Sequence, residues 1–134
     1  MTARTQLIDK ELVQRVRKKV LEEYNKMMSN LMMEEYDLPV VTALSDDELE
    51  KLILVALREA KKPVSWRELK AIFAGIAGED RLRRIIAKFK AENVIAELTK
   101  TRYALPEYVP LNELPKVKNP GIISKILSMS EARQ

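Results

Sequence analysis

The chain has 134 residues, a net charge of +4 and an isoelectric point near 9.3. Hydrophobic residues make up 46% of the chain and charged residues 33%. This composition predicts a globular fold with a core of moderate size. It contains no cysteine and no histidine, which excludes disulfides and most transition-metal sites and removes the commonest general base, so we expect no metal and no other cofactor. The first residues lack the apolar core of a signal peptide and no apolar run approaches the roughly 20 residues that span a bilayer, so we expect a cytoplasmic protein with no membrane contact.

A long amphipathic helix is predicted over residues 9–33, within a first unit formed by residues 1–35. This stretch contains no glycine or proline, and its apolar residues advance by three or four. Because so small a protein cannot cover the whole helix, we expect part of its apolar stripe to meet a second copy of the chain or another protein. The basic run from Arg15 to Lys19 has acids within helical reach and is interpreted as a solvated face, with contact to phosphates as the alternative. The predicted interface residues on this helix are Val13, Val16, Val20, Tyr24, Met27 and Leu31.

A linker follows over residues 36–45, since Pro39 disfavours helix in the residue before it. Ser45 and Glu48 then form the S-x-x-E pattern of a capping box, which predicts the start of a second helix. That helix has one apolar face and stops before Pro63.

Residues 64–103 carry the most organised pattern in the chain. They predict a short strand, a helix, a tight turn, a second helix over about residues 80–93 and a β-hairpin. Ser65 and Glu68 form a second capping box at the start of the first of these helices. Trp66 shares the helical phase of the apolar residues that follow it, so we expect it to pack in the core; the alternative is a surface tryptophan that stacks on a base. Asn93 stands where a helix often ends in a left-handed residue.

The outward side of the helix over residues 80–93 is basic. On a helical wheel Arg84 lies opposite the apolar stripe, with Arg83 and Lys88 beside it. Residues 79–103 carry seven Lys or Arg against four acids, whereas residues 34–50 carry seven acids and no base. Such segregation of charge is what a nucleic-acid-binding face requires; a solvated charged helix is the alternative interpretation.

A helix, a turn, a cationic helix and a basic hairpin in this order resemble the winged helix-turn-helix family over about residues 45–108. In that family the second helix commonly enters the DNA major groove, and the hairpin, called the wing, touches the backbone or the minor groove. The resemblance implies a mainly α fold with a small β-hairpin: a winged domain over residues 46–108, preceded by the long helix and followed by an extended C-terminal tail. The residues predicted to contact nucleic acid are Arg81, Arg83, Arg84, Lys88, Lys100 and Arg102.

The tail, residues 109–134, belongs to a part of the chain that is richer in proline than the residues before it. Four prolines recur between residues 106 and 120, which predicts an extended segment that ends in a short amphipathic helix. The tail is suited to dock on another protein or to fold back on its own domain, and the sequence leaves both open. The tail residues predicted to contact a partner are Ile122, Ile123, Ile126 and Leu127.

The sequence therefore predicts a non-catalytic nucleic-acid-binding protein, such as a transcriptional regulator or a chromatin-type protein, with double-stranded DNA favoured over RNA. An enzyme is disfavoured because neither a glycine-rich phosphate loop nor a nucleophile elbow is present. We expect a homodimer or a subunit of a larger complex. The alternative is that the protein is a small protein-interaction subunit of a replication, transcription or ribonucleoprotein complex. The outward-facing Ala87 and Ala91 favour this alternative, since small residues let another helix approach closely.

Overall fold

The computed structural model of the chain describes residues 8–34 and 44–133, with the backbone alone for residues 30–34 and 130–133. The architecture is mainly helical with a small antiparallel sheet, as the sequence predicts. None of the described helices combines the length and the apolar character needed to cross a membrane. The elements are α1 (Lys10–Glu34), α2 (Asp46–Ala60), β1 (Val64–Ser65), α3 (Trp66–Ile72), α4 (Glu79–Ala91), β2 (Ala96–Leu98), β3 (Arg102–Ala104) and α5 (Ile123–Arg133), with 3-10 turns at Pro106–Tyr108, Leu111–Lys116 and Pro120–Ile122.

Both predicted capping boxes are present. The Ser45 hydroxyl accepts a hydrogen bond from the backbone N–H of Glu48 at 3.2 Å, and the Glu48 carboxylate accepts one from the N–H of Ser45 at 3.0 Å. The Ser65 and Glu68 pair makes the same two bonds at 3.1 and 2.9 Å. Each box satisfies N–H groups that the first turn of a helix leaves without a partner, which fixes where α2 and α3 begin.

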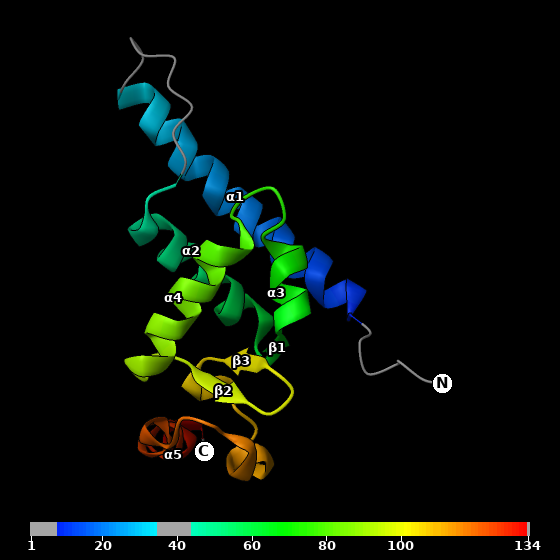
Figure 1. The fold of residues 1–134 in the computed structure, drawn as a ribbon, viewed down its shortest axis with the longest axis vertical. Coiled ribbons are helices and arrows are strands. Elements are labelled where there is room, and N and C mark those ends of the chain that lie inside the picture. Colours follow the sequence, from blue (N-terminus) through cyan, green and yellow to red (C-terminus); the bar gives the residue numbers. More distant parts are fainter. Residues whose placement is uncertain (1–7, 35–43, 134) are drawn as a thin grey trace.

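The three strands form one antiparallel sheet in the order β1-β3-β2. Val64 of β1 pairs with Tyr103 of β3, and Leu98 of β2 pairs with Arg102 of β3. The sheet lies beside the ends of α3 and α4, and α5 lies on its far side (Figure 1). The short β1 thus ties the start of α3 to the hairpin.

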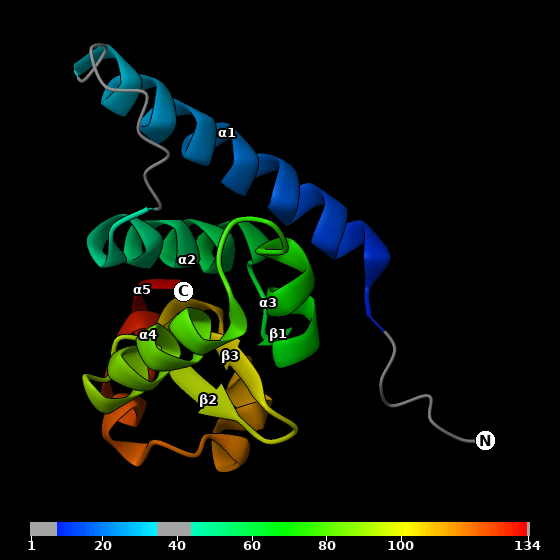
Figure 2. The same cartoon turned by 45° about the horizontal axis from the view of Figure 1, so that its top comes forward.

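Helix α1 crosses over α2 and α3 and is covered by them along part of its length (Figures 1 and 2). Val16 and Val20 are fully buried in the main hydrophobic core, which α2, α3 and α4 complete. These two residues are therefore not available to a partner, contrary to the predicted interface; the chain's own helices cover this part of the stripe. Three other predicted interface residues on α1 are partly buried against the same core: Val13, Tyr24 and Met27. The side chain of Leu31 lies outside the described residues, and so does most of the predicted linker, residues 36–45.

The basic run of α1 is not simply solvated. The Nη1 atom of Arg17 donates to the backbone carbonyls of Ala71, Ile72 and Ala74, at 3.3, 2.8 and 2.8 Å. These carbonyls lie in the last turn of α3 and just beyond it, where a helix leaves acceptors without an intrahelical N–H partner. A cation at this end also interacts favourably with the helix dipole, so Arg17 holds α1 against α3.

The tail folds back on its own domain instead of running extended. Pro106 and Pro120 each begin a 3-10 turn, because the fixed φ of proline suits the first position of a helical turn. Ile122 and Ile126 are fully buried, whereas Ile123 is partly buried and Leu127 is exposed. The interface predicted for Ile122 and Ile126 is thus an intramolecular one, within a second core cluster of Ala96, Leu98, Ala104, Val109, Ile122 and Ile126.

Hydrogen bonds fix the tail along the free edge of β2. The backbone N–H of Lys118 donates to the carbonyl of Glu97 at 2.7 Å, and the N–H of Thr99 donates to the carbonyl of Lys116 at 3.1 Å. The Asn119 side chain accepts from the N–H of Glu97 at 2.9 Å. An edge strand that would otherwise present unpaired backbone groups is therefore covered by the chain itself.

Candidate nucleic-acid interface

Helix α4 has the two-sided character that its sequence predicts. Its buried side consists of four apolar residues, and Arg83, Arg84, Ala87 and Lys88 are exposed on the other side. The helix begins after Gly78 and is followed by Asn93, which has the expected left-handed conformation with a φ of 58°. The buried residues of α4 are Leu82, Ile85, Ile86 and Phe89.

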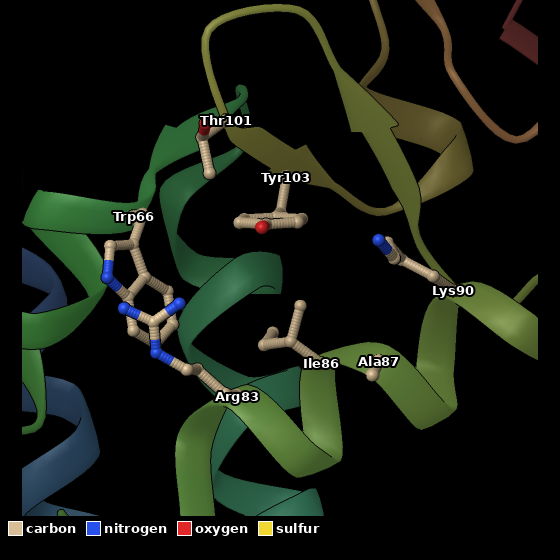
Figure 3. A pocket seen from close by; sticks show the side chains of 7 residues that line it. All are labelled: Trp66, Arg83, Ile86, Ala87, Lys90, Thr101 and Tyr103. Atoms are coloured by element: carbon tan, nitrogen blue, oxygen red, sulfur yellow. The ribbon is translucent and has the colours of Figure 1, made fainter. Parts of the chain in front are cut away.

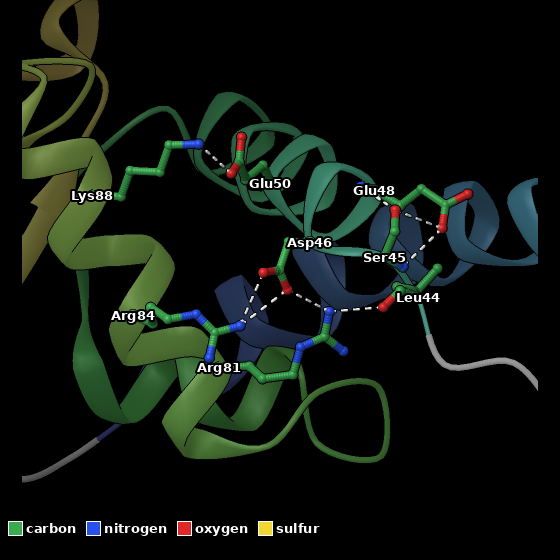
Figure 4. Close-up of polar contacts among 8 residues, drawn as sticks. All are labelled: Leu44, Ser45, Asp46, Glu48, Glu50, Arg81, Arg84 and Lys88. Carbon is green, nitrogen blue, oxygen red and sulfur yellow. Dashed lines mark hydrogen bonds and ion pairs between the residues drawn. The ribbon is translucent and has the colours of Figure 1, made fainter.

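Basic side chains on the α2 side of α4 are held by acids at the start of α2 (Figure 4). The Nη2 atom of Arg84 lies 3.1 and 3.0 Å from the two carboxylate oxygens of Asp46. Arg81 donates to the same carboxylate at 2.9 Å and to the backbone carbonyl of Leu44 at 2.7 Å. Lys88 donates to Glu50 at 2.7 Å. The acidic and basic blocks that are separate in the sequence thus meet in the fold.

These contacts shift the pKa values of Asp46 and of Lys88. The hydrogen bond from Arg81, and then that from Arg84, holds the pKa of Asp46 below its usual range. The hydrogen bond to Glu50 raises the pKa of Lys88. Asp46 therefore stays ionised near neutral pH, and the carboxylates of Asp46 and Glu50 occupy donors that a phosphate group would otherwise use.

Two of the six predicted contact residues have structural roles. The side chain of Arg81 is only 26% exposed, and that of Arg102 only 24%. Arg102 donates to Glu113 in the tail at 2.7 Å and to the carbonyl of Thr99 at 3.0 Å, and its guanidinium lowers the pKa of Glu113. Arg102 is therefore turned toward the tail and fastens it to the hairpin.

The other predicted residues lie on the open surface of α4 and the hairpin. The side chains of Arg83 and Arg84 are 61% and 60% exposed, and that of Lys88 is 47% exposed. Lys100 is exposed at the hairpin turn, with a φ of 66°. Within the described part of the chain it forms no ion pair. These four cations form what we call the basic face: Arg83, Arg84, Lys88 and Lys100.

Arg83 also contacts an aromatic ring. Its guanidinium carbon lies 4.8 Å from the centre of the Trp66 ring, within the range of a cation–π interaction. It donates to Glu79 one turn earlier at 2.9 Å, and this bond is the main cause of the lowered pKa of Glu79. Arg83 thus links the basic face to the start of α3.

A hollow with a volume of about 210 Å³ lies between α4, the start of α3 and the hairpin (Figure 3). Trp66 and Tyr103 approach it from the sheet side, and α4 supplies its floor. Burial raises the pKa of the Tyr103 hydroxyl, which keeps it protonated near neutral pH. We call this space the Trp66 hollow; it is lined by Trp66, Arg83, Ile86, Ala87, Lys90, Thr101 and Tyr103.

Sequence reasoning assigns neither the hollow nor the acids that face the basic helix. The helical phase of Trp66 predicts a packing residue, which agrees with its partial burial but misses the space between its ring and Tyr103. The opposite charges of residues 34–50 and 79–103 are a signal for the ion pairs of Asp46 and Glu50. Among the described residues, no three acids are placed together to hold a metal ion.

A comparison with protein families finds none that matches the chain, and comparisons with curated proteins and with solved structures find no match either.

Proposed function

We propose that the protein is a non-catalytic nucleic-acid-binding protein with a winged helix-turn-helix domain, and that the basic face binds double-stranded DNA. The observation that carries the proposal is the placement of Arg83, Arg84 and Lys88 on the exposed side of α4, next to a hairpin turn that carries Lys100. This order of elements and this distribution of cations are those that the winged helix-turn-helix resemblance implies.

The ion pairs with α2 are compatible with this role. Exposed ion pairs contribute little to stability and exchange partners readily, so a phosphate group can replace Asp46 at Arg84 or Glu50 at Lys88. The acids then act as a competitor that weakens binding to any nucleic acid. The affinity depends on how much more favourably these cations interact with phosphate than with the carboxylates of α2.

The test is fluorescence anisotropy with labelled duplex DNA, with single-stranded DNA of the same sequence and with the corresponding RNA, each at two salt concentrations. Four phosphate contacts predict a slope of log K against log salt of roughly −3.5, which is a loss of about 100-fold between about 50 and 200 mM salt. Tightest binding to the duplex supports the proposal as stated. Absence of binding to every nucleic acid at low salt would refute it.

A second candidate function is that of a protein-interaction subunit of a larger complex. It is favoured by three large apolar side chains that remain on the surface of the tail, with exposed fractions between 36% and 48%. Light scattering and affinity capture with a Leu127→Ser variant as control test this candidate, since loss of a captured protein in that variant supports it. The three residues are Leu111, Leu127 and Met129.

A further inference from the structure

The Trp66 hollow has the chemistry of a site for a flat, anionic ligand. The rings of Trp66 and Tyr103 both border the space, and Arg83 brings a cation to it from α4 (Figure 3). Lys90 also lines the space, and its ammonium group is paired with Glu97 at 2.7 Å. An aromatic ring offers a face on which any nucleobase can stack, and arginine adds a cation–π contribution. A base joined to a phosphate matches both features.

The size of the hollow fits a single base. Its volume of about 210 Å³ exceeds the roughly 150 Å³ of an apolar cavity that accepts benzene, and is below the roughly 300 Å³ at which sites for drug-sized molecules begin. Ala87 leaves room in the hollow, because it lines the space between Arg83 and Lys90 and its side chain is a single methyl group. A larger residue at this position would occupy the hollow.

The hairpin turn forms one wall of the hollow. Thr101 has a φ of 54°, which is a genuine outlier for a β-branched residue. Its carbonyl accepts a hydrogen bond from the backbone N–H of Trp66 at 2.9 Å, so the strained turn is fixed to the start of α3 and its side chain lines the hollow. Lys100 also has a positive φ, and successive positive φ values are typical of tight β-hairpin turns, so the turn geometry explains how the Thr101 side chain is placed at the hollow.

The ring of Trp66 is held by packing and not by a polar anchor. Its indole N–H is buried and has no acceptor among the described residues. The guanidinium of Arg83 lies over the ring, and its own side chain is 61% exposed. Arg83 can therefore move aside for a base and turn its charge toward the attached phosphate.

We infer that the Trp66 hollow receives one unpaired base of a nucleic acid strand whose backbone lies on the basic face. The base stacks against Trp66, Tyr103 closes the inner side of the space, and Arg83 contacts the adjoining phosphate. This inference rests on the proposed function, and it adds to it a preference for a duplex with an unpaired base over a fully paired duplex.

Trp66 is the single tryptophan of the chain, so its fluorescence reports directly on the hollow. The probes are a blunt duplex, the same duplex with one unpaired 2-aminopurine at a strand end, and free adenosine monophosphate. We expect the unpaired base to quench both Trp66 and 2-aminopurine, and to bind about tenfold more tightly than the blunt duplex, within the roughly 5- to 150-fold range of one stacked base.

The matched variants are Ala87→Leu and Ala91→Leu. Both residues are exposed on α4, and leucine is a good helix former, but only Ala87 lines the hollow. We expect Ala87→Leu to abolish the preference for the unpaired base and Ala91→Leu to retain it. For each variant, the ratio of the affinity for the duplex with an unpaired base to that for the blunt duplex separates the effect of the hollow from a general effect on duplex binding.

The other outcomes separate the two proposals. Equal affinity of the wild-type protein for both duplexes, with unchanged Trp66 emission, would overturn the inference and leave the proposed function intact. Failure of every duplex to bind at low salt would overturn the proposed function and the inference with it. Quenching by free adenosine monophosphate but by neither duplex would identify the hollow as a small-molecule site and overturn the strand assignment.

Discussion

The Nη2 atom of Arg84 lies 3.0 Å from one carboxylate oxygen of Asp46, although the two residues are 38 positions apart in the chain. The contact joins the exposed side of α4 to the first turn of α2. A carboxylate at this place makes with arginine the kind of bond that a phosphate would make. Under the proposed function, Asp46 therefore competes with nucleic acid for Arg84.

Replacement of Asp46 should strengthen nucleic-acid binding. Asp46→Asn removes the negative charge that holds Arg84 and Arg81, and we expect the affinity for duplex DNA at low salt to rise about fivefold. The measurement is a titration by fluorescence anisotropy. Asp47→Asn is the matched control, because it makes the same change of charge in the same turn and we expect less than about a twofold effect. Equal gains in the two variants would contradict the competition.

The thermal stability of the protein should fall at acidic pH and should not change with pH near neutrality. Hydrogen bonds from Arg81 and from Arg83 lower the pKa values of Asp46 and of Glu79, respectively. A carboxyl whose pKa is lower in the folded state stabilises the protein fully above its unfolded pKa, and this contribution is lost as the pH falls through the folded pKa.

We therefore expect the Tm from circular dichroism to be constant between about pH 5 and 8 and to fall below about pH 4. The upper range is constant because the chain has no histidine to titrate there. A steep change of Tm between about pH 6 and 8 would show that some other group controls stability.

The contact of Arg17 with α3 should be worth measurable stability. Arg17→Met keeps an extended apolar side chain but removes the donors to the carbonyls of Ile72 and Ala74. We expect the free energy of unfolding to fall by about 1–2 kcal/mol, measured by urea denaturation. Lys18→Met, at the next and exposed position, should change it by less than about 0.5 kcal/mol. Similar losses in both variants would argue against capping of α3 by α1.

Because the tail docks on its own domain, substitutions at two neighbouring residues of α5 should lower the free energy of unfolding by different amounts. Ile126 is fully buried in the second core cluster, whereas the side chain beside it, Leu127, is 48% exposed. We expect Ile126→Ala to lower the free energy of unfolding by about 2–4 kcal/mol, and Leu127→Ala by about 0.5 kcal/mol or less. A larger loss for Leu127→Ala in urea denaturation would show that the tail helix packs on the domain through Leu127 and not through Ile126.

Local features of the fold could be predicted from the sequence because their causes lie within a few residues. The Ser65 capping box needs only Glu68, three positions later, and the apolar stripe of α4 follows from helical spacing alone. The left-handed Asn93 is a property of one residue at the end of one helix. These signals predict the order of the helices and of the hairpin.

Contacts between distant segments could not be predicted in the same way. The Arg17 cap joins residues more than 50 positions apart, and the Trp66 hollow combines residues from α3, α4 and the hairpin turn. Both depend on how helices cross, which the spacing of apolar residues does not specify. The same is true of the tail. Its prolines predict an extended chain, but the burial of Ile122 in the second core cluster folds the tail back on the domain.

The central claim is that the exposed cations of α4 and the hairpin bind nucleic acid, and a paired charge removal tests it most directly. Arg83→Gln/Lys100→Gln removes two charges from the basic face. Lys10→Gln/Lys18→Gln removes two exposed charges from the part of α1 that lies beside α3, outside the basic face (Figures 1 and 2). The salt dependence of duplex binding is measured for both double variants and for the wild-type protein.

We predict that Arg83→Gln/Lys100→Gln weakens binding at low salt by at least about tenfold and makes the slope of log K against log salt shallower by about two, because the variant neutralises two fewer phosphates. The α1 double variant should keep the wild-type slope. Identical slopes in all three proteins, or a greater loss from the α1 variant, would contradict the assignment of nucleic-acid binding to this face.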